Sequence, residues 1–382
     1  MYDLVVRQGR VVDPAQGIDR VADVGVSQGR IVALGALKVE EATRVVTAQG
    51  NLVVPGLIDL HAHIYEAVTW VGLPPDRAGV SAGVTTVVDG GSAGSATFPG
   101  LVRFVLSQAR TTVFCFLHIC RTGLCHLPEM RDWNDVDYED TVAMARAYPD
   151  LIKGIKVRAV EPAVSNMGLE LIRLAKRVAR EAGLPLMVHI GDSKGIEART
   201  LTRELLPLLD KGDILSHCFT GKVGGVLQSD GKVMPELGQA ADRGVVLDIA
   251  HGGNNFSFEV AQRAMEQGLL PHTISTDLAT PNIAGPVFSL THTMSKFLAL
   301  GLGLKQVIEM STINPARALR EDARRGSLRP GVPADITILE LKEGAWEFRD
   351  SENQSRRGQW LLTPVMVVKG GVPIPAEQSQ PG

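Results

Sequence analysis

Two histidines stand two residues apart at the end of an apolar run. The segment PGLIDLHAH, residues 55–63, is typical of a buried strand that finishes at His61 and His63. Because side chains alternate along a strand, residues i and i+2 point to the same side. Two imidazoles directed into one space can share a cation, since histidine is the commonest metal ligand. The pattern also fits two structural histidines at a strand terminus, so the rest of the chain has to decide.

Four more side chains of ligand type follow or end other apolar runs. They are Lys156 in GIKVR, His189 in PLMVHIG, His217 in DILSHC and Asp277 in HTISTD. Each alone has a structural alternative: a satisfied core histidine, a lysine that reaches the surface, or an aspartate that caps a helix. A metal site is favoured over these alternatives only if the fold brings all six side chains together.

The spacing of the apolar runs predicts such a fold. Eight runs recur within residues 55–280: LIDLHAH, VTTVVDG, VFCFLHI, IKGIKVR, PLMVHIG, DILSHC, VVLDIAHG and HTISTD. Helix-like stretches separate many of them, most clearly at 168–183, around 286–302, and at 304–319. Alternating strands and helices favour a (β/α)8 TIM barrel, whose chemistry lies at the carboxyl ends of the strands. A doubly wound sheet would place a Gly-rich phosphate turn after the first strand, where His-Ala-His stands instead.

Short strands and turns flank this middle region on both sides. We therefore expect a small β-sandwich domain built from residues 1–54 and 322–375, a barrel over residues 55–321, and a loose tail at 376–382.

Composition excludes several classes of function. The 382 residues are 45% hydrophobic and 21% charged with a net charge of −3, and no basic stripe suggests nucleic acid. No apolar run reaches the ~18 residues of a membrane span, and the amino terminus lacks the features of a signal peptide. A cytoplasmic protein is the default expectation. Cys115, Cys120 and Cys125 lack C-x-x-C spacing, which argues against a zinc site made from them.

The six ligand-type residues, in this order, resemble the site of the amidohydrolase superfamily, and GIKVR, SHCFTGK, HGGNNFSF and ISTD resemble its dihydroorotase-like branch. The resemblance implies that His61, His63 and Asp277 hold one divalent ion and that His189 and His217 hold another. Lys156, carboxylated by CO2 to a carbamate (N6-carboxylysine), would bridge the two. Zinc is the default metal, although manganese, cobalt or nickel fits the same ligands.

The resemblance also implies a mechanism, in which a metal-bridging hydroxide attacks a carbonyl and Asp277 carries the proton to the leaving group. Arg158 lies two residues after Lys156 on the same strand, so it is predicted to bind a substrate carboxylate or stabilise transition-state charge. Its alternative is a structural pair with a neighbouring acid. His251, Tyr65 and Arg121 are predicted substrate contacts. The remaining histidines are predicted to be structural: His118, His126, His272 and His292.

We therefore predict a zinc-dependent hydrolase that cleaves an ester or non-peptide amide of a small, carboxylate-bearing acyl compound. The alternatives are a cyclic amide hydrolase of dihydroorotase or hydantoinase type and a metal-free scaffold of the same fold. Dihydroorotases carry an arginine in the pattern H-x-H-x-R, whereas this chain has Ile64 and Tyr65 after His63. A deaminase is disfavoured because purine and pyrimidine deaminases of the superfamily commonly lack the bridging lysine. The expected partner is a small molecule, with homo-oligomer formation implied by the resemblance.

Overall fold

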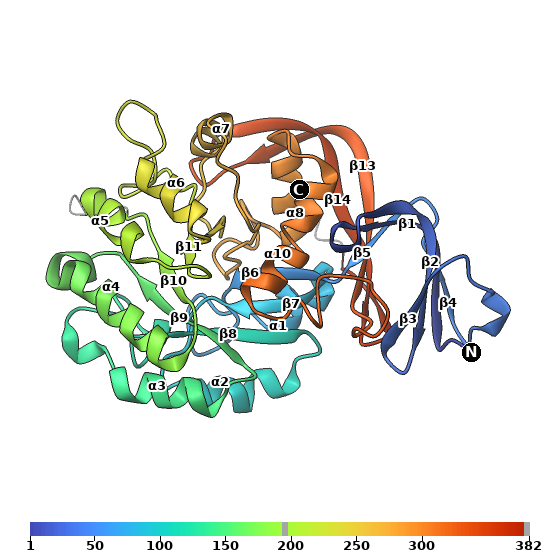
Figure 1. Ribbon diagram of the computed structural model, residues 1–382, viewed down its shortest axis with the longest axis horizontal. Coiled ribbons are helices and arrows are strands. Elements are labelled where there is room, and N and C mark those ends of the chain that lie inside the picture. The colour runs from blue at the N-terminus through green and yellow to red at the C-terminus, as the bar shows by residue number, and fades with distance from the viewer. Residues whose placement is uncertain (193–197, 378–382) are drawn as a thin grey trace.

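The computed structural model describes residues 1–192 and 198–377 and contains two sheets (Figure 1). One sheet is formed by strands from both ends of the chain, and the other forms the centre of the molecule. The predicted fold class is confirmed: a (β/α)8 barrel accompanied by a separate β structure from the termini. Most of the predicted tail at 376–382 lies outside the described residues.

The sheet from the termini has the order β15-β14-β13-β5-β1-β2-β3, with β4 beside β1. The antiparallel pairing of β13 with β5 joins the two ends of the chain. Alternating apolar residues such as Leu4, Val6, Val24 and Ile336 are fully buried and give this sheet a small core of its own. The strands are β1 Leu4–Asp13, β2 Ile18–Ser27, β3 Arg30–Gly35, β4 Val45–Thr47, β5 Leu52–Pro55, β13 Ile336–Arg349, β14 Ser355–Lys369 and β15 Val372–Pro375.

The central sheet contains seven parallel strands in sequential order, which match seven of the eight predicted runs. Almost all their residues are buried, as expected for parallel strands covered on both faces. The strands are β6 Leu57–Ala62, β7 Val84–Asp89, β8 Thr112–His118, β9 Ile152–Arg158, β10 Leu186–His189, β11 Ile214–Ser216 and β12 Val246–Asp248.

The eighth run closes the barrel without forming a regular strand. Thr273 bridges Asp248, the last residue of β12, and Leu278 bridges Ala62, the last residue of β6. Backbone hydrogen bonds continue on both sides, from His251 N to Ser275 O at 3.1 Å and from Asp277 N to His61 O at 2.6 Å. The positive φ of Asp277, 50°, interrupts the extended conformation there.

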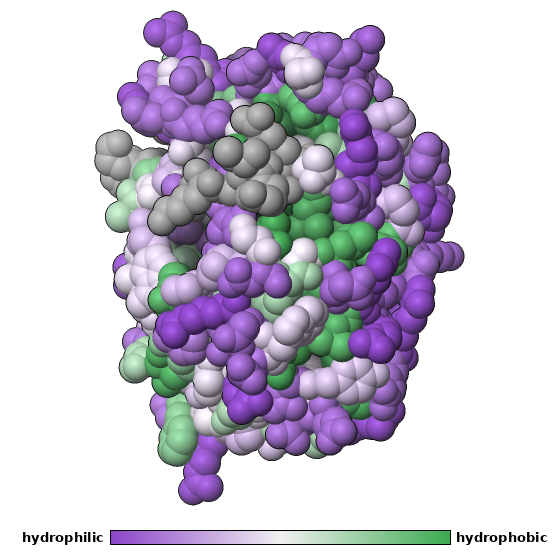
Figure 2. Space-filling view, turned by 90° about the vertical axis from the view of Figure 1, so that its left-hand side faces the viewer, coloured by the Kyte–Doolittle hydropathy of each residue, from purple (hydrophilic) through white to green (hydrophobic). Residues whose placement is uncertain are grey.

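Helices cover the outside of the barrel. In α4, buried residues such as Leu171, Ala175 and Val178 recur at helical spacing, so one stripe faces the strands. Figure 2 views the side on which α4, α5 and α6 lie and shows a largely hydrophilic surface with a central band of hydrophobic residues. The helices are α1 Pro75–Ala78, α2 Phe98–Phe104, α3 Tyr138–Ala147, α4 Ala163–Ala182, α5 Ala198–Leu205, α6 Pro235–Asp242, α7 Phe258–Glu266, α8 Leu290–Ala299, α9 Leu304–Glu309 and α10 Ile313–Ala318.

One helix prediction needs correction. The stretch 304–319 forms two helices, α9 and α10, with a break at Met310–Thr312. Pro315 has no N–H to bond the carbonyl of residue 311, and its ring would clash there in a continuous helix. In the first turn of a new helix the proline is tolerated, which explains where α10 begins. None of the helices in the described part of the chain is long and apolar enough to cross a membrane.

Candidate active site

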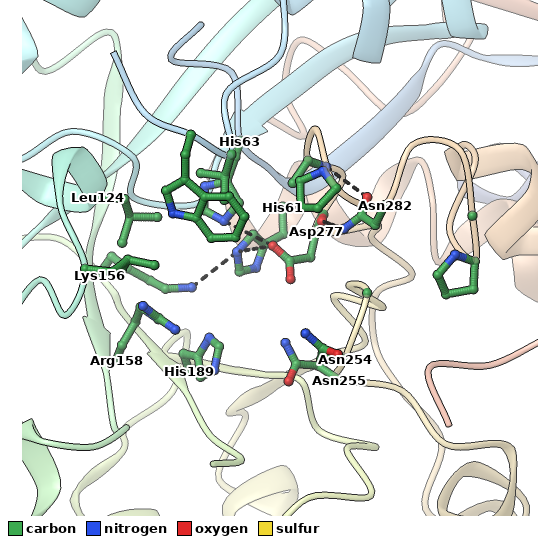
Figure 3. Close-up of a pocket in the computed structure, with 18 residues that line it drawn as sticks. His61, His63, Leu124, Lys156, Arg158, His189, Asn254, Asn255, Asp277 and Asn282 are labelled. Atoms are coloured by element: carbon green, nitrogen blue, oxygen red, sulfur yellow. Dashed lines mark hydrogen bonds and ion pairs between the residues drawn. The ribbon is translucent and has the colours of Figure 1, made fainter. Parts of the chain in front are cut away.

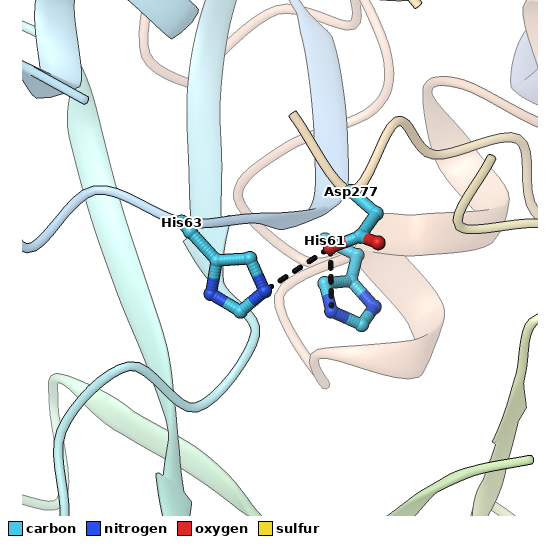
Figure 4. Close-up of side chains that lie close together, drawn as sticks. All are labelled: His61, His63 and Asp277. Atoms are coloured by element: carbon cyan, nitrogen blue, oxygen red, sulfur yellow. Dashed lines mark ion pairs between the residues drawn. The ribbon is translucent and has the colours of Figure 1, made fainter. Parts of the chain in front are cut away.

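Three predicted ligands meet at the carboxyl end of β6. The Asp277 Oδ1 atom lies 3.1 Å from His63 Nε2 and 3.6 Å from His61 Nε2 (Figure 4). One ligand atom from each of the three residues lies within 4.8 Å of the other two. Two imidazoles and a carboxylate at this separation form a donor set suited to a divalent cation.

His189, at the end of β10, and His217, after β11, face this cluster. Their ring centroids are 4.1 Å apart, and that of His217 is 5.4 Å from His61. His217 Nδ1 lies 2.6 Å from Ala250 O, so it must carry the proton that it donates. The buried Nε2 atom is then a bare acceptor, and it has no partner among the described residues. Such an unsatisfied buried acceptor fits a metal ligand.

Lys156 lies beside His61, toward which its amine points (Figure 3). Its side chain is buried, and Nζ is 3.3 Å from His61 Nε2 and 3.4 Å from Met187 Sδ. Burial lowers the pKa of Lys156 to about 7, against a smaller opposing effect of Asp277. Within the described residues, no carboxylate forms an ion pair with this lysine.

Burial also sets the protonation of the imidazoles. It lowers the pKa of His61 and His189 well below the ordinary value and that of His217 to about 3. All three rings are therefore neutral at physiological pH, which is the form that binds metals. Burial alone would raise the pKa of Asp277, but the hydrogen bond and charge of His63 bring it below the ordinary value.

Hydroxyl groups of two serines orient the rings of His61 and His63. His61 Nδ1 lies 2.9 Å from Ser216 Oγ, and His63 Nδ1 lies 2.8 Å from Ser92 Oγ. Ser216 Oγ is in turn 3.5 Å from Asp248 Oδ2. These contacts leave the Nε2 atoms of both rings facing Asp277, as metal-binding histidines require. Ser92 and Ser216 could not be recognised from the sequence, because serines carry no distinctive spacing signal.

The backbone bends sharply where the ligands leave the strands. His217, Ala250 and Asp277 have φ values of 64°, 38° and 50°. Non-glycine residues seldom adopt positive φ, and such conformations concentrate at functional sites. Asn282 supports the bend at Asp277, because its Nδ2 donates to Asp277 O at 2.8 Å.

A cavity of about 450 Å³ opens above these residues. One wall is polar and contains Arg158, His189, Asn254 and Asn255 (Figure 3). The lining also includes the apolar side chains Trp70, Val71, Leu124, Leu127 and Ala279. The two asparagines were not among the predicted site residues, although they lie within the stretch HGGNNFSF.

The structural alternative for Arg158, a pair with a neighbouring acid, is present, and its role toward a substrate stays a prediction. Arg158 lines the cavity, and its Nη1 also forms an ion pair with Glu129 Oε1 at 2.9 Å. A guanidinium has five N–H donors, so this pair leaves others available to a substrate carboxylate.

The structure does not bring the other predicted substrate contacts into the cavity. Both ring nitrogens of His251 are engaged, with Gly252 O at 2.8 Å and Lys296 Nζ at 2.7 Å. The Tyr65 hydroxyl donates to Thr97 O at 2.9 Å, and Arg121 is exposed outside the cavity lining. The structure therefore places these three residues outside the cavity lining, and their role as substrate contacts stays a prediction. Thr97 and Lys296, which bind Tyr65 and His251, lie 32 and 45 residues away, so these hydrogen bonds could not be foreseen.

Comparisons with known proteins agree with this geometry. Family models described as "Amidohydrolase family" match residues 52–205 and 250–375. A deacetylase of Agrobacterium fabrum is 36% identical over 357 residues, covering 92% of this chain and 86% of that protein. The chain belongs to the amidohydrolase superfamily. Within this superfamily it is a hydrolase of the dihydroorotase-like branch, and superfamily members generally use a divalent metal.

The relatives are named for different reactions. A deacetylase of Enterococcus faecalis is 32% identical, with 97% of this chain and 98% of that protein covered. The crystal structure of a dihydroorotase matches with a TM-score of 0.88 and 33% identity over 99% of each chain. That of an adenine deaminase matches with a TM-score of 0.89 and 31% identity, covering 98% of this chain and 100% of that one. Similarity alone therefore does not select a substrate.

Proposed function

We propose that the protein is a binuclear metal-dependent hydrolase that cleaves an ester or non-peptide amide of a small, carboxylate-bearing acyl compound. The observation that carries the proposal is the convergence of five metal-ligand side chains around buried Lys156, beside a cavity whose polar wall contains Arg158. The deacetylase names of relatives at 36% and 32% identity support hydrolysis of an acyl group.

The donor set divides into two groups. His61, His63 and Asp277 would hold one ion, His189 and His217 would hold the other, and carboxylated Lys156 would bind both. Neutral imidazoles suit zinc, and a carbamate supplies two oxygen atoms for two cations. Ions bound here would polarise a carbonyl and lower the pKa of water.

The chain itself would bind the substrate and move its proton. Arg158 would orient the acyl compound through its carboxylate, while the apolar lining at Leu124 and Val71 excludes water. Asp277, whose pKa lies below its ordinary value, would accept a proton from the attacking water. The same Oδ atom would then pass this proton to the leaving oxygen or nitrogen.

A cyclic amide is the second candidate substrate class, favoured by the similarity to a dihydroorotase at 33% identity. The chain departs from the H-x-H-x-R pattern at Tyr65, whose hydroxyl is engaged with Thr97. The metal-free scaffold is disfavoured because all six ligand positions are filled and converge.

The decisive experiment combines metal analysis with a hydrolysis screen. The purified chain would be tested on both enantiomers of N-acyl and O-acyl small acids, with dihydroorotate, hydantoin and adenine in the same panel. Two divalent ions per chain and preferred cleavage of acyl acids support the proposal. Faster turnover of dihydroorotate or adenine, or an active chain without metal, contradicts it.

A further inference from the structure

His118, the last residue of β8, is a buried histidine without an assigned role. It is fully buried, and its Nδ1 atom accepts the N–H of Cys120 at 2.9 Å. A ring nitrogen that accepts a hydrogen bond carries no proton, so the proton of the neutral ring is on Nε2. This buried Nε2–H donor has no acceptor among the residues that the structure describes. Unsatisfied buried donors are rare and require an explanation.

Lys156 is the neighbouring residue that can provide an acceptor for this donor once it is carboxylated. β8 and β9 are parallel, and His118 is paired in register with Lys156. Residues paired in register on adjacent strands direct their side chains to the same face of the sheet. Gly91 packs against both: a Cβ atom there would lie 2.6 Å from Lys156 Cγ and 3.4 Å from His118 Cδ2. Because Cδ2 adjoins Nε2, the free donor edge of the ring lies on the side of the Lys156 stem.

We propose that His118 is a positioning residue whose Nε2–H donates a hydrogen bond to the carboxylate formed on Lys156. The inference rests on the proposed carboxylation of this lysine. In that step the neutral amine attacks CO2, a C–N bond forms, and one N–H proton leaves to solvent. The product carries one negative charge, and His118 neither gives nor takes a proton.

Two substitutions of His118 separate its two hydrogen bonds. His118→Asn keeps an oxygen near the position of Nδ1 to accept the Cys120 N–H, but it removes the donor at Nε2. His118→Gln returns an N–H near that position. His292→Asn is the matched control, since His292 is also a buried histidine with an unpartnered ring nitrogen, but on α8.

The full-length chains would be stripped with a chelator and then given zinc chloride and ¹³C-bicarbonate. Carbamate would be measured by ¹³C NMR, zinc per chain by mass spectrometry, and folding by circular dichroism. We expect His118→Asn to need about ten-fold more bicarbonate than the native chain for half-maximal carbamate and zinc uptake, because it lacks a hydrogen bond to a charged group. His118→Gln should recover part of this loss, and His292→Asn should match the native chain.

Failure of the proposed role of His118 can be distinguished from failure of the proposed function. A native carbamate signal with unchanged bicarbonate dependence in His118→Asn overturns the role of His118 and leaves the proposed function intact. A native chain without any carbamate signal overturns both. If His118→Asn does not fold, His118→Ser, which also lacks the Nε2 donor, replaces it under the same criteria.

Discussion

Asp277 makes two kinds of contact at the end of β6. Its carboxylate contacts the rings of His61 and His63, and its backbone N–H donates to the carbonyl of His61. One residue thus holds the barrel closed, completes a ligand cluster and faces the cavity. The placement of Asp277 and of the five other predicted ligands could be inferred from the sequence, because side chains at the carboxyl ends of barrel strands converge. The hydroxyls of Ser92 and Ser216 could not, since their roles depend on contacts between distant strands.

The first prediction concerns Asp277. Asp277→Asn keeps the size of the side chain but removes the group that would carry the proton. We expect kcat on the substrate found by the screen to fall by about 10²–10⁴-fold, which is the usual contribution of general acid–base catalysis. Most of the bound metal should remain, as measured by mass spectrometry. An Asp277→Asn chain with native kcat would exclude the proton-carrying role.

Arg158 carries the second prediction. Removal of its guanidinium leaves buried Glu129 without a cation, so the test compares Arg158→Met/Glu129→Gln with Glu129→Gln alone. We expect the double variant to raise KM for a carboxylate-bearing substrate by about ten-fold or more, because a charge-assisted hydrogen bond is lost. Steady-state kinetics on the methyl ester of that substrate, which has no carboxylate, should show no such difference. Equal KM changes for both compounds would exclude a carboxylate contact.

At the scale of elements, the hairpin of β13 and β14 supports one side of the cavity. Buried Lys296 on α8 donates from Nζ to three acceptors at 2.7 Å each: His251 Nε2, Pro286 O and Arg349 O. It therefore connects the segment after β12, the loop that lines the cavity and the end of β13. Seven strands were predictable from apolar runs, but this connection was not, because no local pattern signals a partner 53 residues away.

The third prediction follows from this lysine. Lys296→Met leaves three buried acceptors without a donor, so we expect the free energy of unfolding to fall by about 2 kcal/mol or more. Amide exchange should accelerate in residues 251–256 and 284–287, while zinc content stays native. Lys305→Met is a suitable control, since Lys305 lies on α9 without such contacts among the described residues. Native exchange rates in Lys296→Met would contradict the supporting role.

Lys296 should also make the free energy of unfolding depend on pH. Burial lowers the pKa of Lys296 to about 7, partly opposed by the charge of Asp350. Between pH 7 and about 10 the unfolded chain therefore binds more protons at this position than the folded chain. The free energy of unfolding, relative to Lys296→Met, should rise by up to about 1.4 kcal/mol per pH unit in urea titrations. A constant difference across this range would show that the three acceptors keep the pKa at its ordinary value.

At the scale of the whole molecule, buried charges join the sheet of the termini to the barrel. Asp335, just before β13, accepts from Arg325 Nη1 at 2.9 Å and from Lys369 Nζ at 2.7 Å. Lys369 also donates to Thr112 Oγ1 on β8 at 2.7 Å. The contribution of both termini to one β structure was predictable from their strand-rich composition. The cluster of charges was not, since its members are spread over residues 112–369.

The last prediction tests this cluster. Asp335→Asn removes the shared carboxylate from Arg325 and Lys369, two largely buried cations, so we expect a loss of about 3 kcal/mol in the free energy of unfolding. Asp19→Asn, which removes an exposed pair with Arg10, should cost less than about 1 kcal/mol. Urea unfolding measures both, and kcat per folded chain should stay native. Equal effects of the two substitutions would show that the buried cluster does not join the two parts.

The turn between β13 and β14 also bears on how the protein is made. Ser351 Oγ donates to Gly252 O at 2.9 Å, and Asp350 Oδ2 accepts from Phe258 N at 2.8 Å, on either side of Asn254 and Asn255. A nascent chain released by the ribosome before residue 350 would already contain all six ligand residues but not this turn. The cavity is therefore completed only after residues 350 and 351 have been synthesised, and products that terminate before them should be poor enzymes even when they bind metal.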